Sequence, residues 1–270
     1  MEEPEENLLY FIEKNSPVLK PWQRELVRIV RKISQYWYPQ RQTKVLNEGI
    51  ATFTHYYILN KLYDENQISD AHMMEWLSSH ANVVYQPAYD HKRYSGINPY
   101  ALGYAIFRDI RRMCENPTEE DRRWFPSLPG ADWRAVVREA ATEYRDDSFV
   151  MQWLSPRVAR EMKLFSIEDD HAKDSIKVDA IHNPETFAQL RTNLGNSYDI
   201  NSLEPNILVV EADLKGDRKL VLEHRRVNDR LLNTNTDVML EHLRRLWGYQ
   251  VILRSVSAAG TTLQTFRSSL

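Results

Sequence analysis

The chain has 270 residues, of which 42% are hydrophobic and 27% charged, as is typical of a globular protein with one large or two ordinary domains. Its net charge of −3 gives no general attraction to nucleic acid, and no apolar run is long enough for a transmembrane segment. The single cysteine, Cys114, excludes an internal disulfide and a cysteine-rich zinc site. The first residues are acidic, unlike a secretory signal, so the sequence predicts a cytoplasmic protein that binds no nucleic acid.

Helical patterns extend over the first 163 residues. Apolar side chains recur at helical spacing from Trp22 to Tyr38, and Pro39 is expected to end that helix. A second helix contains Glu48 and extends to about Tyr63. Start signals for further helices are Ser69, Asn98 before Pro99, and Thr118. These and other patterns predict helices at residues 70–80, 98–114, 132–144 and 156–163.

Residues 164–270 alternate between strand and helix patterns. Two β-prone segments within 164–181 surround a polar turn at 169–174, and Pro184 begins a short helix. The turn at Lys215–Asp217 indicates a hairpin, and the tail from Ala258 is expected to be frayed. The remaining elements predicted are strands at 206–212, 219–224 and 249–256, and a helix at 236–247. We therefore expect an α+β fold, with a predominantly helical domain over residues 1–163 and a small α+β domain with an antiparallel sheet over residues 164–270.

The segment around Asn47-Glu48-Gly49 is the most informative part of the chain. Glu48 and His55 are seven residues apart, so they point to nearly the same side of an otherwise apolar helix. Burying both side chains is costly unless each has a partner, either another side chain or a metal ion. They lie about 10 Å apart along the helix axis, so a single ion is not expected to bind both.

A long loop rich in tyrosine, residues 83–100, separates two of the predicted helices. Tyrosine and asparagine suit a surface that binds sugar or peptide, because they combine flat apolar faces with hydrogen-bonding groups. The alternative is a loop packed by its own tyrosines. The residues predicted to bind substrate are Tyr85, Tyr94, Asn98 and Tyr100.

Several blocks of the sequence resemble the stage V sporulation protein R (SpoVR) family. They include Asn7-Leu8-Leu9-Tyr10-Phe11, Trp22-Gln23-Arg24-Glu25, Asn47-Glu48-Gly49, Ser95-Gly96-Ile97-Asn98-Pro99-Tyr100 and Leu203-Glu204-Pro205-Asn206. The resemblance implies a bacterial protein that acts in assembly of the spore cortex, which is peptidoglycan, or in the stress response. Family members are usually longer, and this chain resembles their C-terminal half alone. The missing N-terminal half, or other proteins, are therefore the expected partners.

The Glu48 helix is also similar to the second ligand helix of zinc peptidases of the gluzincin type. That resemblance implies a metallohydrolase-like site in which Glu48 binds zinc and His55 assists catalysis. No His-Glu-x-x-His segment occurs in the chain, so such a site would be incomplete here. The alternative is that Glu48 pairs with an arginine and His55 bonds a tyrosine. In that case the protein would be a non-catalytic regulator or scaffold that acts through protein partners.

One further expectation concerns the apolar surface of the Glu48 helix. If the Glu48 helix is covered by another half of the protein, then Phe53, Tyr57 and their neighbours remain partly uncovered in this chain. Large exposed apolar patches promote association. The sequence therefore predicts that the chain self-associates.

Overall fold

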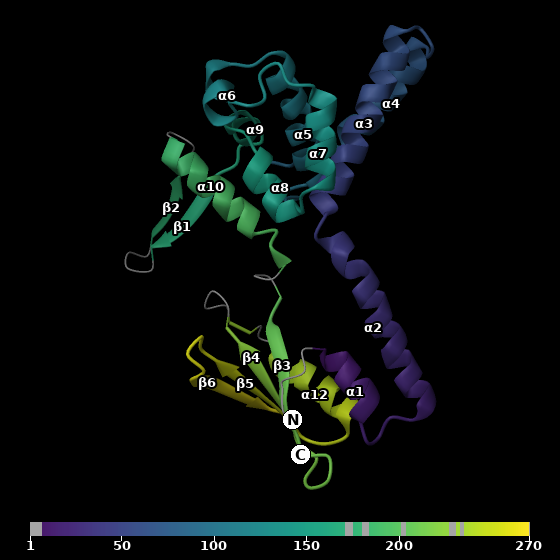
Figure 1. The fold of residues 1–270 in the computed structure, drawn as a ribbon, viewed down its shortest axis with the longest axis vertical. Coiled ribbons are helices and arrows are strands. Elements are labelled where there is room, and N and C mark those ends of the chain that lie inside the picture. Colours follow the sequence, from purple (N-terminus) through teal and green to yellow (C-terminus); the bar gives the residue numbers. More distant parts are fainter. Residues whose placement is uncertain are drawn as a thin grey trace. The chain divides into compact units, whose positions relative to one another are not determined.

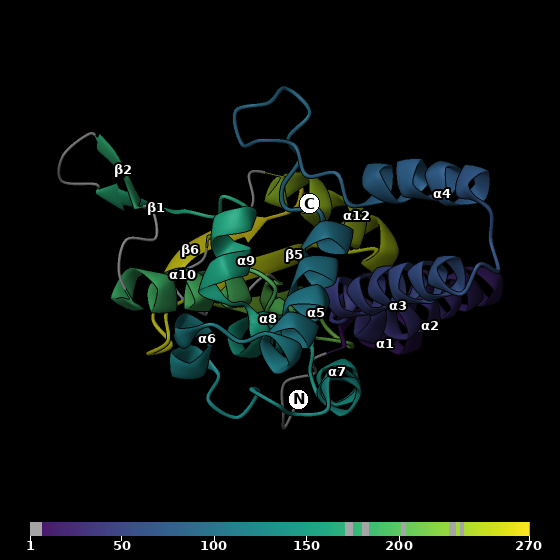
Figure 2. The ribbon, with the colours of Figure 1, turned by 90° about the horizontal axis from the view of Figure 1, so that it is seen from above.

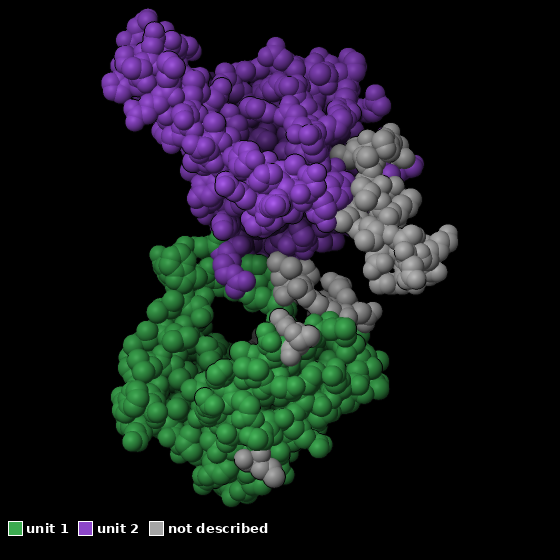
Figure 3. All heavy atoms as spheres, turned by 180° about the vertical axis from the view of Figure 1, so that it is seen from behind, with its two compact units in different colours: residues 1–40, 200–270 green, residues 41–199 purple. Residues whose placement is uncertain are grey.

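The computed structural model describes residues 7–170, 175–179, 184–200, 204–226, 231–232 and 235–269. Helices predominate in the first part of the chain and a four-stranded mixed sheet lies in the last part, so the predicted α+β class is confirmed (Figure 1). The chain forms two compact units, one of residues 41–199 and one of residues 1–40 with 200–270 (Figure 3). This division does not follow the boundary after residue 163 that composition suggested, because the first two helices belong to the unit that contains the sheet.

The unit of residues 41–199 is a helical assembly with one small hairpin. Its elements are α3 (Lys44–Asp64), α4 (Asp70–Val83), α5 (Pro99–Glu115), α6 (Glu119–Trp124), α7 (Trp133–Thr142), α8 (Asp146–Trp153), α9 (Pro156–Glu161), β1 (Ser166–Asp170), β2 (Ser175–Asp179) and α10 (Pro184–Asn196). Helix α4 returns along the C-terminal part of α3 (Figure 2). Strands β1 and β2 pair antiparallel, and the turn predicted between them lies largely outside the described residues.

Helix α5 is the centre of this unit. Most of its residues are buried, and Leu102, Ile106, Phe107 and Ile110 have no exposed surface. The N-terminal half of α3 packs against it, whereas the C-terminal half of α3 is largely exposed. The expectation that the Glu48 helix is largely buried is therefore wrong for its second half, where most side chains are at least partly exposed. The described neighbours of that half are α4 and, through Tyr56 and Tyr57, α5 and α7.

Local signals account for most helix starts. Ser69, Asn98 and Thr118 each accept a hydrogen bond from a backbone N–H in the first turn of α4, α5 and α6, as predicted. Asp121 completes the capping box of α6 by accepting from the backbone N–H of Thr118. Helices α1 (Leu8–Asn15) and α8 were not predicted from the sequence.

Helix α2 (Pro21–Arg41) continues through Pro39, so the prediction that Pro39 ends it was wrong. Proline lacks an N–H and removes one helical hydrogen bond. Here it stands only two residues before the end of the helix, where the lost bond interrupts little. The next helix, α3, begins at Lys44.

The second unit combines α1 and α2 with a sheet. Its other elements are β3 (Asn206–Ala212), β4 (Leu220–Arg225), α12 (Thr236–Trp247), β5 (Val251–Val256) and β6 (Thr262–Arg267). The sheet order is β3-β4-β5-β6, with β4 and β5 parallel and the other two pairs antiparallel. The sheet was predicted to be antiparallel but is mixed. The chain passes from β4 through α12 to β5, and this connection brings β5 back in the same direction as β4. The expected frayed tail instead contains β6, which pairs with β5.

The core of this unit explains why the first helices join it. Phe11 of α1 stacks on Trp247 of α12 with ring centroids 5.8 Å apart, and both side chains are buried. The indole N–H of Trp247 donates to the carbonyl of Arg218 at 2.6 Å. Residues more than two hundred positions apart therefore share one apolar core. None of the helices in the described residues, α2 and α3 included, has the length and apolar character needed to cross a membrane.

Candidate functional site

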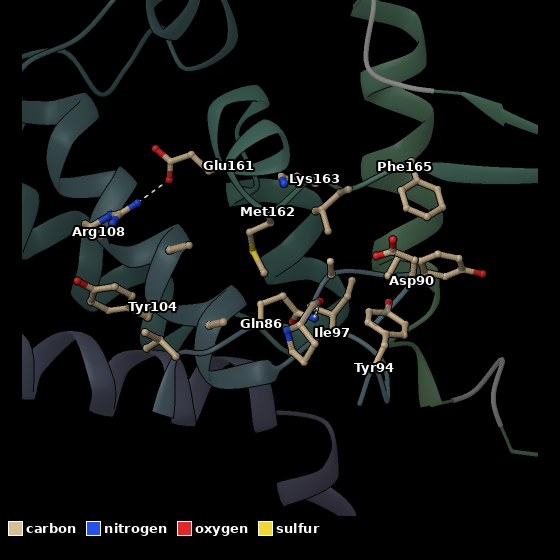
Figure 4. Close-up of a pocket in the computed structure, with 17 residues that line it drawn as sticks. Gln86, Asp90, Tyr94, Ile97, Tyr104, Arg108, Glu161, Met162, Lys163 and Phe165 are labelled. Carbon is tan, nitrogen blue, oxygen red and sulfur yellow. Dashed lines mark hydrogen bonds and ion pairs between the residues drawn. The ribbon is translucent and has the colours of Figure 1, made fainter. Parts of the chain in front are cut away.

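A cavity of about 800 Å³ lies in the helical unit (Figure 4). Its walls come from the loop between α4 and α5, from α5 itself and from the residues that follow α9. Helix α5 contributes Ala101, Tyr104, Ala105 and Arg108, whose spacing of three and four residues places them on one side of the helix. The two alanines leave room between α5 and the loop, and the two larger residues supply hydrogen-bonding groups.

One end of the cavity is charged. The guanidinium of Arg108 donates to the carboxylate of Glu161 at 2.5 Å (Figure 4). Arg108 also lies over the ring of Tyr104, with 5.6 Å from its guanidinium carbon to the ring centroid. Lys163 lies close to this ion pair along the chain and also lines the cavity. The side chains of Arg108 and Glu161 are 48% and 36% exposed, so a polar ligand can reach both charges.

The other end is aromatic. The ring of Tyr89 stands edge-on to Tyr94 at 5.2 Å and to Phe165 at 4.9 Å between centroids. Asp90 lies beside these rings (Figure 4). Tyr89 is 57% exposed, so its ring is not packed into the core and is available to a ligand. The cavity thus joins a flat apolar surface to a pair of opposite charges.

Hydrogen bonds fix the loop that carries the tyrosines. The amide nitrogen of Asn98 donates to the carbonyls of Val83 at 2.8 Å and Tyr85 at 3.1 Å, and its oxygen caps α5 by accepting from the N–H of Tyr100. Gln86 accepts from the backbone N–H of Asn98 at 2.6 Å and donates across the loop to Gly96. The loop therefore has a defined shape and presents its exposed tyrosines from a braced backbone.

The four residues predicted to bind substrate do not lie together in the structure. Tyr94 lines the cavity, whereas Tyr85, Asn98 and Tyr100 are not part of its wall. Asn98 uses its side chain to hold the loop, and Tyr85 is exposed outside the cavity. Tyr89, which was not selected from the sequence, is the tyrosine of this loop that contacts both other rings.

Glu48 has a tyrosine as its partner. The hydroxyl of Tyr100 bonds to the Glu48 carboxylate, and this hydrogen bond raises the pKa of Tyr100. The alternative in which Glu48 pairs with an arginine is therefore not what the structure shows. The neighbouring Gly49 lies against Gly103, where α3 and α5 cross. Glu48 and Gly49 of the Asn-Glu-Gly motif thus serve the contact between these two helices, whereas Asn47 bonds Thr43.

His55 lies in an aromatic cluster on the exposed part of α3. Its ring stands edge-on to Trp76, with centroids 5.8 Å apart, and the side chain is exposed. His80, on α4, lies deeper, with its ring centroid within 5.2 Å of Tyr56, Trp76 and Tyr104. Burial lowers the pKa of His80, and the charge of His55 lowers it further. The spacing of Trp76 and His80, four residues apart on one helix, was the available sequence signal for this cluster.

Tyr104 connects the histidine cluster with the cavity. It contacts His80, with centroids 4.9 Å apart, and it also lines the cavity. Burial raises the pKa of Tyr104 to about 12, so its hydroxyl is protonated at neutral pH and can donate a hydrogen bond. Glu48 and His55 do not join this arrangement as a pair, because Glu48 contacts Tyr100 and His55 contacts Trp76.

The described residues do not fit a zinc site. Nowhere in the described ranges do three His, Cys, Asp or Glu side chains gather closely enough to hold a metal ion. A protein zinc site needs three or four such ligands, and Glu48 contributes one that is already bonded to Tyr100.

Comparison with known proteins identifies the family. Residues 1–203 match the family described as SpoVR like protein, and residues 205–258 match the SpoVR-like C-terminal domain. A relative in Escherichia coli (strain K12), the uncharacterized protein YcgB, is 49% identical over 259 residues. No solved structure matches the chain.

The aligned part covers 96% of this chain and 51% of YcgB, so the chain spans about half the length of that relative. The expectation that the chain corresponds to the C-terminal half of the family length is not confirmed, because the family match begins at residue 1 and the two matches together extend to residue 258. With matches over nearly all of its length, the chain belongs to the SpoVR-like family.

Proposed function

We propose that this protein is a non-catalytic, cytoplasmic member of the SpoVR-like family that binds a sugar–peptide fragment of the cell wall and thereby serves spore cortex assembly or the stress response. The observation that carries the proposal is the cavity, with the rings of Tyr89, Tyr94 and Phe165 at one end and the Arg108–Glu161 pair at the other. Sugar rings stack on flat aromatic faces, and peptide carboxylates and amines pair with opposite charges.

The size of the cavity agrees with this class of ligand. Sites for small molecules commonly enclose about 300–1,000 Å³ and combine apolar walls with a few placed polar groups. At about 800 Å³ the cavity has room for a disaccharide with a short peptide. Tyr104 adds a hydroxyl donor beside Arg108 at the charged end, and the braced loop keeps the aromatic end in place.

The hydrolytic alternative assigns zinc to Glu48 and a catalytic role to His55. It would need metal ligands from outside the described residues, and the two side chains have separate neighbours. Metal analysis of the purified protein distinguishes the alternatives. Stoichiometric zinc that is lost with Glu48→Ala would support the hydrolase and contradict the binding proposal.

The direct test is calorimetric titration with a soluble disaccharide-tetrapeptide from peptidoglycan. We expect a dissociation constant of about 10–1,000 µM and a weakening of about tenfold in Tyr89→Ala and in Arg108→Gln. Tyr85→Ala is the matched control, since Tyr85 and Tyr89 are equally exposed on the same loop but only Tyr89 lines the cavity. Absence of binding, or equal losses in Tyr85→Ala and Tyr89→Ala, would overturn the proposal.

A further inference from the structure

Helix α2 exposes its largest apolar face. Five residues of this face, which we call the α2 seam, follow one another at intervals of four, three, four and three residues. They are Trp22, Leu26, Ile29, Ile33 and Tyr36, and between 42% and 67% of each is exposed. Val30 and Trp37 lie beside the seam and are also more than half exposed. An amphipathic helix normally buries such a stripe, and the part of the chain that the structure describes leaves the seam uncovered.

The contact of α2 with its own unit uses the opposite side of the helix. Val27 is the buried residue of α2, and Arg24 donates to the backbone carbonyls of Glu13 and Ser16. Arg31 bonds the carboxylate of Glu13 at 3.1 Å. At 100° per residue, Arg31 points about 180° away from Trp22, and Val27 about 140° away. The seam is therefore free of the contacts that hold α2 in place.

The spacing of the seam is that of a coiled coil. Alternating steps of four and three residues define the d and a positions of a heptad, which interlock with the same positions of a second helix. In this heptad Glu25 and Lys32 both occupy g positions, on one flank of the seam. The other flank carries Gln23, Val30 and Trp37 and has no charge.

We infer that the α2 seam pairs antiparallel with the α2 seam of a second copy of this chain. In an antiparallel pair the g positions of the two helices face each other, so Glu25 of each copy meets Lys32 of the other. The same register places Trp22 opposite Ile33 and Leu26 opposite Ile29 in the core. Apolar layers and charges are thus complementary in one register, and the contact closes with two-fold symmetry.

Other arrangements lose this match. Shifting the antiparallel register by one heptad places Lys32 opposite Lys32 of the second copy, which is repulsive. A parallel pair places Glu25 next to Val30 and Lys32 next to Trp37, so neither meets an opposite charge of the other copy, and Glu25 keeps only its ion pair with Arg28 of its own helix. The charge pattern therefore selects the antiparallel register. Because about two heptads overlap, we expect a weak dimer with a dissociation constant of about 1–100 µM.

Sedimentation equilibrium of the full chain tests the pairing. The expected mass rises with concentration from 31.9 kDa to twice that value. Ile29→Asp should abolish the dimer. Glu25→Lys alone and Lys32→Glu alone should each weaken it about tenfold, because each creates two like-charged contacts per dimer. The double variant with both substitutions should restore it, and so should mixing the two single variants.

The controls separate the seam from general charge or solubility effects. Lys61→Glu reverses one charge of the exposed Lys61–Glu65 ion pair on α3, which is not part of the seam. Met74→Asp removes an exposed apolar side chain on α4. Both should leave the dimer unchanged, and circular dichroism should show the same helix content in every variant. A protein that stays monomeric at about 100 µM, or single and double charge variants that are equally weak, would overturn the inference.

Discussion

Gly49 of α3 and Gly103 of α5 meet backbone to backbone where the two helices cross. A Cβ atom added at Gly49 would lie 2.4 Å from the Cα of Gly103, and one added at Gly103 would lie 2.2 Å from the carbonyl oxygen of Val45. Such distances do not occur between real atoms, so any side chain would push the helices apart. The crossing places Glu48 beside Tyr100 and sets the position of α5, which carries the cavity wall.

Gly49→Ala should therefore destabilise the helical unit. We expect a loss of about 3 kcal/mol in the free energy of unfolding, despite the gain of about 1 kcal/mol that alanine brings to a helix. Gly195→Ala on α10 is the matched control, because its nearest obstacle is the flexible side chain of Met151. Urea melts of both variants measure the difference. Similar stabilities for the two would show that the helices can separate at little cost.

The start of α3 depends on a residue a hundred positions away. Buried Asp146 of α8 accepts hydrogen bonds from the backbone N–H groups of Val45 and Leu46, both at 2.9 Å. Asp146→Ala leaves these donors unpaired in the interior, so we expect a loss of about 2–3 kcal/mol. Hydrogen exchange should show faster exchange at the first turn of α3. Asp147→Ala, next in the sequence, is the control and should have a much smaller effect.

A buried charge network joins α5, α6 and α9. Arg112 bonds both carboxylate oxygens of Asp121 at 2.7 Å and one oxygen of Asp109 at 2.6 Å, while Ser155 donates to Asp109 at 2.6 Å. Arg112→Met should cost about 3–5 kcal/mol, because it removes the cation that bonds Asp121 and leaves Asp109 with only the more distant Arg157, at 4.0 Å. Chemical denaturation at pH 7 measures this loss. Arg111→Met, which removes an exposed pair with Glu115, should cost less than about 1 kcal/mol.

The same network predicts sensitivity to acid. Burial alone would raise the pKa of Asp121, but hydrogen bonds from Arg112 and Thr118 lower it to about 2. A lowered pKa in the folded state contributes stability above the unfolded value near 3.8, and this contribution is lost as the pH falls toward 2. We expect it to be on the order of 1–2 kcal/mol. Unfolding measured from pH 5 to pH 2 should show a smaller decrease in Asp121→Asn than in the unmodified protein.

The lowered pKa of His80 predicts a second effect of pH on the stability of the fold, at milder acidity. Its pKa is lowered by burial and by His55, so the unfolded chain takes up the proton more readily than the folded chain. The stability contributed by neutral His80 is complete above the unfolded pKa near 6.5 and decreases as the pH falls below it. His80→Gln should reduce the difference in stability between pH 8 and pH 5.5. His224 in the other unit also has a lowered pKa, so the effect must be taken as a difference between variants.

Much of the secondary structure follows from short stretches of sequence. Ser69, Asn98 and Thr118 begin helices because each can satisfy an unpaired N–H within three residues, whatever the rest of the chain does. Gly248 ends α12 because it adopts a φ of 93°, which other residues rarely tolerate. These interactions are local, so the sequence alone was enough to predict them, and with them the α+β class.

Long-range packing decided the rest. Strand β6 was missed because its stability comes from pairing with β5, and α1 joins the sheet unit through the contact of Phe11 with Trp247. The cavity was also invisible in the sequence, since its walls combine residues from 84–108 with residues 161–165, which the chain brings together only on folding. By itself the sequence identified the tyrosine loop, the Glu48 helix and the family. The fold decided that Glu48 bonds Tyr100 and that Tyr89 and Arg108 face the cavity, because side-chain neighbours depend on which helices pack together.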